Sequence, residues 1–329
     1  MRIAIDGSAL VNGSRAICRH SKNLINTMLQ LYSDFDYKIF YLDRRRRNQR
    51  YVKLPNKGFA KEYIVSTPGK ILIPSWKYFG APKAEWFIGE FDIFYATDLY
   101  FPPSAKGIVL GTVHGLAYYS IEEKLIKEEV SSLKNGLSFT LKNADYLLAV
   151  SNQTRKELIQ ILNVPRERIY VVTHGVDPKF KKLNKDNFFF NRLRKKFGLQ
   201  SPYILYVGTI GHHKNIMGIL EAYSISYNQG IDTPLVLAGP RGNAWKEANK
   251  WVINKGMKKN VKFIGPLDQH KNDITDLYNG ASLFVFPSFY EGWTSPPLES
   301  MACGTPVITS NCSSLPETVG EAAILVDPN

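Results

Sequence analysis

The chain has 329 residues, of which 44% are hydrophobic and 22% are charged. This length predicts about two domains with separate cores, and the composition excludes disordered, collagen-like and small disulfide-stabilised proteins. The first 200 residues contain 33 Lys and Arg against 18 Asp and Glu, whereas residues 201–329 contain 9 against 11, so the two halves differ in charge. Three cysteines without a paired spacing predict a reduced compartment and no zinc site. The sequence has no run of ~18 apolar residues, which favours a cytoplasmic location.

Short β-branched runs alternate with helical patterns along the chain, which is typical of βαβ units and a parallel sheet. In the first half we expect helices around residues 24–29 and over 153–162. The expected strands there are residues 2–6, 37–42, 93–96, 108–113, 146–150 and 169–172.

A basic, polar stretch over residues 178–200 interrupts this alternation, and we expect an interdomain linker at 181–200. The pattern then restarts. In the second half we expect helices over residues 245–253 and around 274–277. The expected strands there are residues 203–208, 235–239, 261–265, 283–286 and 307–310.

The strongest local signal runs from residue 286 to residue 306. An apolar strand leads into a loop, and Ser295 and Pro296 are suited to be the N-cap and first residue of a helix. Ligands bind at the carboxyl ends of strands in open α/β sheets, and the free N–H groups of a helix N-terminus favour an anion such as a diphosphate. Glu291 and Glu299 flank this site, and each carboxylate can accept two hydrogen bonds from a sugar diol.

A second loop of small residues, over 208–215, leads from a predicted strand into a predicted helix. Its Lys214 would place a positive charge beside a phosphate. A lone lysine at a helix start is more often a solvated surface residue. We expect the two loops to face the same edge of the sheet.

Glu291 and Glu299 form an E-x7-E element, followed by Gly-Thr-Pro-Val at 304–307, Leu-Pro-Glu at 315–317 and Gly-Glu-Ala-Ala at 320–323. With Asp6-Gly7, Val113-His114, Gly-Val-Asp at 175–177 and Leu-Tyr-Val-Gly-Thr at 205–209, the chain resembles the retaining GT-B glycosyltransferases of family 4, mannosyltransferase-like members in particular. The resemblance implies an α/β fold of two Rossmann-like domains that face each other across a cleft. We expect an acceptor-side domain at 1–180 and a nucleotide-sugar-binding domain at 201–329.

The resemblance also implies roles for single residues. Glu291 would hold the donor sugar, Glu299 the ribose and Lys214 the diphosphate, while His114 would face the donor sugar and acceptor. The implied catalytic residues are therefore His114, Glu291 and Lys214. The implied donor-binding residues are Gly13, Thr209, His213, Lys214, Gly265, Pro266, Glu291, Gly292, Trp293, Thr294, Ser295 and Glu299. Such enzymes need no metal ion and no cofactor, and neither is assigned.

Several positions depart from the family's pattern. Ala16 and Cys18 stand where glycines are usual, and His213 replaces an arginine before the lysine. Trp293 begins a Trp-Thr-Ser run in place of Phe-Gly-Leu, and the sequence ends at residue 329, where relatives continue through further helices. These departures keep open a second hypothesis, a degenerate relative that binds a nucleotide sugar or glycan without turnover.

The basic first half has three interpretations. Arg44 to Arg47, with further cations up to Lys61, would attract anionic lipid headgroups, and the aromatic and cationic segment 187–197 could lie on a membrane or be a packed linker. Nucleic-acid binding rests on charge alone and is not expected.

The sequence thus predicts a transferase that moves a hexose with retention from a GDP- or UDP-sugar. The acceptor would be a glycan or a lipid-linked molecule in cell-surface polysaccharide synthesis. The enzyme would be cytoplasmic or peripheral to the inner face of the membrane.

Overall fold

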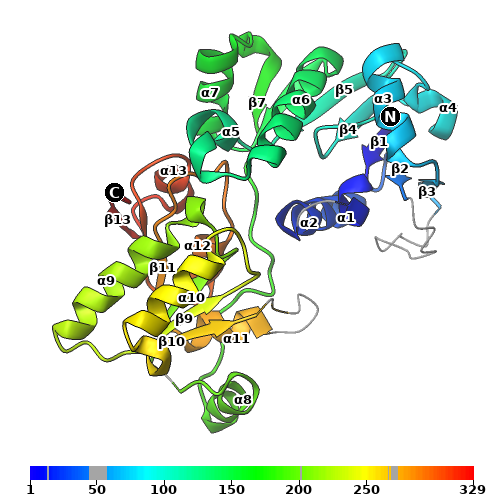
Figure 1. Ribbon diagram of the computed structural model, residues 1–329. Coiled ribbons are helices and arrows are strands. Elements are labelled where there is room, and N and C mark those ends of the chain that lie inside the picture. Colours follow the sequence, from blue (N-terminus) through cyan, green and yellow to red (C-terminus); the bar gives the residue numbers. More distant parts are fainter. Residues whose placement is uncertain (13–14, 44–57, 201, 266, 268–272) are drawn as a thin grey trace. The chain divides into compact units, whose positions relative to one another are not determined.

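The computed structural model describes residues 1–12, 15–43, 58–200, 202–265, 267 and 273–329, the side chains of residues 12, 15 and 16 excepted. The chain forms two compact units (Figure 1). The first comprises Met1–His114, Glu128–Val150 and Thr154–Thr173, and the second comprises Gly115–Lys127, Ser151–Gln153 and His174–Asn329. Each unit contains its own parallel β-sheet.

The first unit contains a sheet with the order β3-β2-β1-β4-β5-β6-β7. Every described pair in it is parallel, as the alternation of strands and helices predicts. Its strands are β1 (Arg2–Asp6), β2 (Asp36–Leu42), β3 (Ala60–Val65), β4 (Ile93–Ala96), β5 (Ile108–Val113), β6 (Tyr146–Ala149) and β7 (Ile169–Val171).

Helices cover both faces of this sheet because its strands are apolar on both sides. On one face, Ile25 and Leu29 of the amphipathic helix α2 pack with Ile3 and Ile5 of β1. On the other face, Gly111 lies against Thr140 of α6. The helices before β7 are α1 (Ser8–Asn12), α2 (Arg15–Leu31), α3 (Gly69–Phe79), α4 (Ala84–Ile88), α5 (Ala117–Ser120), η1 (Glu122–Lys124), α6 (Lys127–Asn143), α7 (Asn152–Leu162) and η2 (Arg166–Arg168). Of these, α5 and η1 belong to the second unit.

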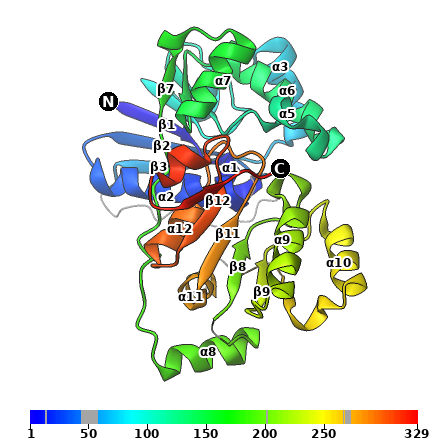
Figure 2. The same ribbon diagram turned by 90° about the vertical axis from the view of Figure 1, so that its left-hand side faces the viewer.

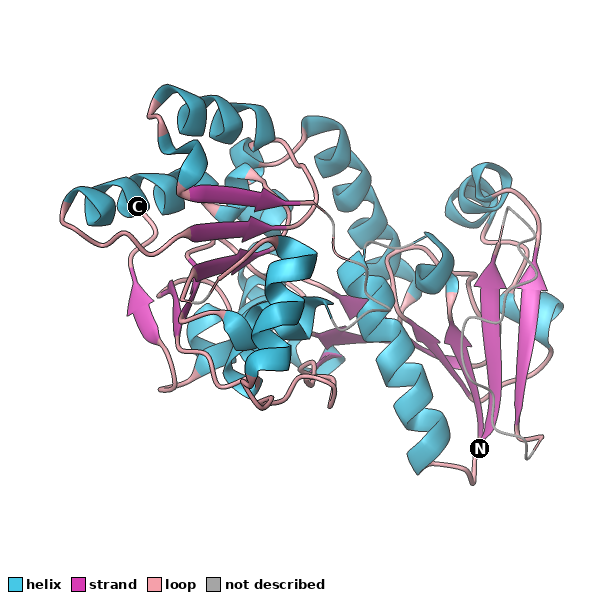
Figure 3. Ribbon diagram, turned by 90° about the horizontal axis from the view of Figure 1, so that it is seen from below, coloured by secondary structure: helices cyan, strands magenta, loops and turns pink. Residues whose placement is uncertain are grey.

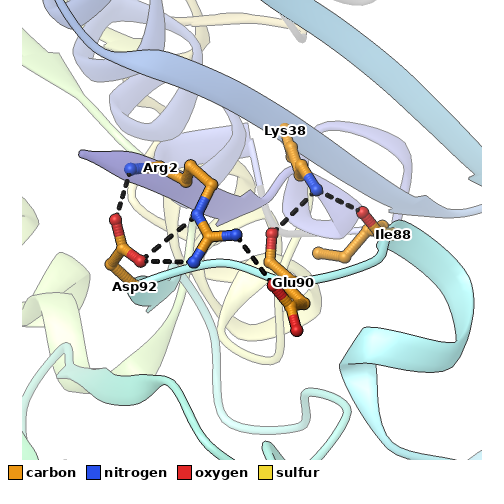
Figure 4. Close-up of polar contacts among 5 residues, drawn as sticks. All are labelled: Arg2, Lys38, Ile88, Glu90 and Asp92. Carbon is orange, nitrogen blue, oxygen red and sulfur yellow. Dashed lines mark hydrogen bonds and ion pairs between the residues drawn. The ribbon is translucent and has the colours of Figure 1, made fainter.

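Polar contacts fix the segment between α4 and β4 to the first two strands (Figure 4). The Arg2 guanidinium donates hydrogen bonds to Asp92 at 2.7 and 3.2 Å and to Glu90 at 3.1 Å. The Lys38 ammonium donates to the carbonyl oxygens of Ile88 and Glu90, both at 2.8 Å. The carboxylates after α4 are therefore already paired with a cation.

The second unit contains a sheet with the order β10-β9-β8-β11-β12-β13, and its described pairs are also parallel (Figure 3). Its strands are β8 (Ile204–Val207), β9 (Leu235–Ala238), β10 (Val261–Ile264), β11 (Leu283–Phe286), β12 (Val307–Ser310) and β13 (Ile324–Val326). Its helices are α8 (Asn187–Phe197), η3 (His212–Lys214), α9 (Ile216–Asn228), α10 (Trp245–Asn254), η4 (Met257–Lys259), α11 (Asp273–Gly280), α12 (Pro296–Ala302) and α13 (Leu315–Val319).

The segment expected as a linker at 181–200 belongs to the second unit, whose longest continuous part is His174–Asn329. It contains α8, which begins after the N-cap Asp186 and ends at Gly198 in the left-handed conformation. Phe189 and Leu193 of α8 are buried in the core of this unit. This segment is a packed helix rather than a linker because its aromatic and aliphatic residues recur at helical spacing.

An ion pair also holds α8 in place. The Arg192 guanidinium donates two hydrogen bonds of 2.7 Å to the buried carboxylate of Asp276 in α11, and Lys196 pairs with Asp273. Two of the segment's cations are therefore engaged within the unit, which leaves them less available for the membrane contact proposed for residues 187–197.

Candidate functional site

The strand order of the second sheet reverses direction between β8 and β11. Strands β9 and β10 follow β8 on one side, and β11 to β13 extend the sheet on the other side (Figure 2). Loops that leave the two central strands at such a point diverge and leave room for a ligand at the carboxyl edge. These loops are residues 208–215 after β8 and residues 287–295 after β11, the two that the sequence singled out.

The loop after β8 ends in the single turn of η3, which contains Lys214. Asn215 follows in the left-handed conformation, with φ 56°, and its side chain accepts a hydrogen bond from the Gly218 N–H as the N-cap of α9. Lys214 therefore precedes the helix. The sequence analysis had placed it at the helix start. The Thr209 carbonyl oxygen accepts hydrogen bonds from the Tyr206 hydroxyl at 2.8 Å and from the Gly211 N–H at 2.9 Å, which shapes the loop.

Lys214 and Glu291 join the two loops through a direct ion pair. The Lys214 Nζ lies 2.5 Å from the Glu291 Oε1, and their side chains are 15% and 9% exposed. The ammonium also lies 5.4 Å from the centre of the Phe286 ring at the end of β11. A largely desolvated pair of this kind concentrates opposite charges at the sheet edge.

The backbone around Glu291 is held by serines that the sequence analysis missed. The Glu291 N–H donates to the Ser313 Oγ at 3.0 Å, and the Ser314 hydroxyl donates to the Glu291 carbonyl oxygen at 2.8 Å. The Phe289 N–H donates to the His213 carbonyl oxygen at 3.0 Å and thereby ties the two loops together. The Glu291 carboxylate is thus positioned by main-chain contacts that leave the carboxylate itself available for chemistry.

His213 contributes no positive charge to this site near neutral pH. Burial lowers the pKa of its imidazole to about 3, and the charges of Lys214 and His212 act in the same direction. A neutral imidazole can donate or accept a hydrogen bond, whereas the arginine usual at this position is always charged. The replacement of an arginine by His213 therefore removes a positive charge from this loop.

Glu299 lies in the first turns of α12, after Ser295 at the N-cap and Pro296 as first residue, as predicted. Its side chain is 2% exposed, and its Oε2 accepts a hydrogen bond of 3.0 Å from the Tyr278 hydroxyl of α11. Thr294 before the helix is also buried. Glu299 is therefore a buried carboxylate with a fixed orientation.

The remaining residues of the loop after β11 are packed closely. Gly292 is buried, and the ring of Trp293 lies 6.3 Å from that of His174 in an edge-on arrangement. The indole nitrogen of Trp293 is buried and has no hydrogen-bond partner among the described residues. Buried indole N–H groups usually have an acceptor, so this one is an exception within the described part of the chain.

A cavity lies beside this site at the ends of β9 and β10. It is lined by Ile210, Leu237, Gly239, Arg241, Trp245, Phe263, Ile264 and Gly265. The Arg241 guanidinium lies 4.4 Å from the Trp245 ring centre, and that ring meets Phe263 edge-on at 4.7 Å. Sequence reasoning placed Gly265 here but missed Arg241 and Trp245, although Gly-Pro-Arg-Gly after a predicted strand was a usable signal.

The first unit has its own reversal of strand order, between β1 and β4. The Thr97 hydroxyl after β4 donates a hydrogen bond of 2.7 Å to the Asp6 carbonyl oxygen at the end of β1. The Nε2 of His114, after β5, lies 2.8 Å from the Thr97 carbonyl oxygen. Because a carbonyl only accepts, this nitrogen carries a proton. Asp6, Thr97 and His114 thus form a polar cluster at this edge.

Asp6 of this cluster and His20, which lies beside it, have strongly shifted pKa values. Burial, with a contribution from His114, lowers the pKa of His20 to about 4, and the two imidazole rings lie 6.2 Å apart. Burial raises the pKa of Asp6 to about 7 against the opposing hydrogen bonds from Ser8. Asp6 Oδ2 is buried without a hydrogen-bond partner among the described residues. Near neutral pH, a small change in surroundings therefore decides the charge of Asp6.

Replacing Asp6 with asparagine is expected to stabilise the protein at pH 8 but not at pH 5. A carboxyl whose folded-state pKa is raised contributes its full stability below the unfolded-state pKa of about 4. It loses this contribution as the pH rises to about 7, by roughly 1.4 kcal/mol for each pH unit. Asparagine resembles the protonated acid and does not titrate. Urea unfolding of both proteins from pH 4 to 8 measures the difference, and parallel pH profiles would contradict a buried Asp6 with a raised pKa.

Two predicted site residues, Gly13 and Pro266, lie outside the described residues, as do Arg44 to Arg47. Within the described part of the chain, no group of three or more His, Cys, Asp or Glu side chains is arranged to hold a metal ion. In the same part, no helix is both long and apolar enough to cross a membrane.

Comparisons with protein families match both halves of the chain. A family model described as glycosyl transferases group 1 matches residues 189–329, and one described as glycosyltransferase family 4 matches residues 19–180. O-antigen chain mannosyltransferase B of Escherichia coli is 29% identical over 325 residues, which cover 95% of this chain and 83% of that protein. The serotype-specific mannosyltransferase WbdA of Escherichia coli is 31% identical over 192 residues, which cover 56% of this chain and 23% of WbdA.

Solved structures share the fold over the whole chain. Sucrose-phosphate synthase from Thermosynechococcus elongatus has a TM-score of 0.70 at 19% identity, and HepE from Anabaena in complex with UDP and glucose has a TM-score of 0.71 at 16% identity. Each match covers 100% of this chain and 86% of the other protein.

Proposed function

Because this chain belongs to the group 1 glycosyltransferases with the GT-B fold, we propose that it transfers a hexose with retention from a GDP- or UDP-sugar to a glycan or lipid-linked acceptor. The observation that carries the proposal is the ion pair of Lys214 and Glu291 at the point where the second sheet reverses its strand order. This pair places a cation that suits a diphosphate in direct contact with a carboxylate that can accept hydrogen bonds from sugar hydroxyls.

The pair suits a donor that separates its two members. A diphosphate carries more negative charge than one carboxylate and would draw the Lys214 ammonium to itself. Glu291 would then accept hydrogen bonds from the sugar hydroxyls. The backbone contacts of Glu291 with Ser313 and Ser314 do not involve its carboxylate, so they would hold the residue in place during the exchange.

Other residues of the second unit would bind the rest of the donor. The buried Glu299 carboxylate would accept hydrogen bonds from the ribose, and Thr209, Thr294 and Ser295 would border the phosphates. The cavity beside Gly265 would receive the base, where Trp245 offers a ring face and Arg241 a planar cation. His213, being neutral, would act only through hydrogen bonds.

The proposed reaction is a displacement on one face of the sugar, through an oxocarbenium-like transition state. The bond between the anomeric carbon and the diphosphate oxygen breaks, and the acceptor oxygen forms its bond on the same face. The acceptor proton passes to the departing diphosphate oxygen. Lys214 stabilises the charge that develops on that oxygen, and preorganised charges of this kind supply much of an enzyme's rate. His114 and Asp6, in the first unit, would bind hydroxyls on the acceptor side.

The relatives support a role in polysaccharide synthesis with mannose as the hexose. O-antigen chain mannosyltransferase B matches nearly the full length of this chain, and its name states both the sugar and the polymer. The complex of HepE with UDP and glucose supports a nucleoside diphosphate at this fold's donor site.

Binding of GDP or UDP, and of the matching hexose conjugate, is expected to raise the thermal unfolding midpoint in the presence of EDTA. A ligand that binds only the folded protein stabilises it by ~2.7 kcal/mol at a hundredfold excess over its Kd. Arg241→Met should raise the ligand concentration needed for the same shift at least tenfold, because it removes the cation beside Trp245. The exposed Lys250→Met in α10 is the matched control. Donor hydrolysis is then assayed for each ligand that binds.

Absence of a shift with every nucleotide and nucleotide sugar would overturn the proposal. A shift without hydrolysis, and without transfer to mannose-terminated or lipid-linked acceptors, would identify a binding protein that has lost turnover.

A further inference from the structure

Helices α3 and α4 of the first unit, labelled in Figure 1, carry an exposed apolar surface. Seven large apolar side chains of the described residues are more than 60% exposed, and four of them fall within this short stretch of chain. They are Ile71 (61%), Tyr78 (71%), Phe79 (82%) and Trp86 (76%). We call these four side chains, with Lys70 and Lys77, the α3–α4 surface.

Helix α3 has apolar residues on the face that solvent reaches as well as on the buried face. Leu72 and Trp76 face the core, four residues apart. Ile71 and Tyr78, seven residues apart, share the opposite face. A surface helix of a water-soluble protein ordinarily carries polar residues there, so this helix is built for two apolar environments.

The charges of this surface are predominantly positive. Lys70 and Lys77 are exposed and, seven residues apart, share a face adjoining Ile71 and Tyr78. The one acidic residue of α4, Glu85, is engaged within the protein, where its Oε1 accepts hydrogen bonds from Ser104, Ala105 and Lys106. Glu90 and Asp92, which follow α4, share an ion pair with the single cation Arg2 (Figure 4).

The surface is also supported rigidly. Ala84 and Ile88 of α4 are buried, and Lys38 donates hydrogen bonds to the carbonyl oxygen of Ile88 at the end of that helix and to that of Glu90 just after it. At the end of α3, Gly80 takes the left-handed conformation and donates its N–H to the Trp76 carbonyl oxygen. Phe79 is thus presented from the end of α3 and Trp86 from the middle of α4, and neither is on a loop.

We propose that the α3–α4 surface docks the protein on an anionic lipid bilayer. Aromatic rings with a polar or charged neighbour prefer the headgroup level of a membrane, and lysines beside them are attracted to anionic headgroups. The combination of exposed Trp, Phe, Tyr and Ile with exposed lysines matches that chemistry better than a protein interface, whose core is depleted of lysine. The purpose of this docking rests on the proposed function, because a lipid-linked acceptor would be held in the membrane.

The test is co-sedimentation of the full chain with vesicles, without any donor or acceptor. Phosphatidylcholine vesicles are compared with vesicles that contain about 30% phosphatidylglycerol, at low and high salt. The variants are Phe79→Ser/Trp86→Ser, which removes the two most exposed rings, and Lys70→Glu/Lys77→Glu, which reverses the charge. Phe188→Ser is the matched control, because Phe188 is 73% exposed in the second unit.

The wild type and Phe188→Ser are expected to bind the anionic vesicles. The aromatic variant should bind at least tenfold more weakly, and the charge-reversed variant should lose most of its preference for phosphatidylglycerol. Equal binding of the aromatic variant and the wild type, or no binding to any vesicle, would overturn the proposal. A dimeric wild type that becomes monomeric in the aromatic variant, in buffer without lipid, would assign the surface to a second copy of the chain instead. Thermal unfolding confirms that the variants fold, and glycosyl transfer to a soluble acceptor should not change in any of them.

Discussion

Replacing Glu291 with glutamine is expected to lower kcat/KM for glycosyl transfer at least a hundredfold while the fold is retained. The amide cannot balance the Lys214 ammonium or grip a sugar diol with two oxygens, whereas the backbone bonds to Ser313 and Ser314 persist. Loss of one preorganised electrostatic contact at a reacting centre commonly costs 10²–10³ in rate. Steady-state kinetics with the donor identified by thermal unfolding measures the effect.

The free energy of unfolding distinguishes the structural role of the Lys214–Glu291 pair from its role in the reaction. Each of Glu291→Gln and Lys214→Met leaves one buried charge without its partner, which costs about 3 kcal/mol of unfolding free energy. The double variant leaves neither charge and should be more stable than either single variant, yet as inactive. The control is Glu221→Gln, at an exposed position of α9. Near-wild-type kcat/KM in Glu291→Gln would contradict the role assigned to this carboxylate.

Replacing Gly239 with alanine is expected to prevent stable folding of the second unit. Gly239 follows β9 with φ 153°, and a Cβ placed on it would lie 1.9 Å from the Gly208 carbonyl oxygen. The neighbouring backbone cannot move aside easily, because the Gly208 N–H donates to the Ala238 carbonyl oxygen and the Gly239 N–H donates to that of Ile264. The yield of soluble protein and its thermal unfolding midpoint measure the effect.

Two other glycines serve as graded controls for Gly239. A Cβ on Gly175 meets nothing within 4 Å, so Gly175→Ala should be neutral or slightly stabilising. Gly230 also has open space around it, but its φ of 93° makes alanine cost roughly 1–2 kcal/mol. Comparable unfolding midpoints for Gly230→Ala and Gly239→Ala would mean that the contact with Gly208 has no energetic consequence.

The sequence predicts most strands because each is a short apolar run with turn residues at its ends. The expected strands over 2–6, 93–96, 283–286 and 307–310 coincide with β1, β4, β11 and β12. The GT-B fold that the resemblance implies is confirmed by the two parallel sheets and by the solved structures that match the whole chain.

The elements that sequence reasoning missed have mixed patterns. Strand β3 (Ala60–Val65) lies at the edge of its sheet and contains Lys61 and Glu62, so its apolar run is interrupted. Helix α3 contains Pro74 and is apolar on both faces, which obscures helical periodicity. In α8, many cations conceal the buried positions Phe189 and Leu193. Each of these elements is stabilised by tertiary burial more than by its local pattern.

The sequence predicted the two loops of the candidate site but not the contacts that distant segments make there. Both loops lie at the β8 and β11 ends, and the contact of Lys214 with Glu291 agrees with the expectation that they face one edge. The low charge of His213 and the high pKa of Asp6 depend on burial, which a linear pattern does not contain. The Arg241–Trp245 pair and the serines under Glu291 come together only through the packing of distant segments. The catalytic and binding roles of the named residues stay predictions until the variants are measured.

The hydrogen bond from Phe289 to His213 passes between main-chain atoms, so it does not depend on which side chains occupy these two positions. Mutational drift at position 213 can therefore exchange an arginine for a histidine without separating the two loops. The main-chain contact between the two loops would then remain while the polarity beside Lys214 and Glu291 changes. Position 213 is therefore a place where the charge next to the site can be altered without loss of the loop-to-loop hydrogen bond.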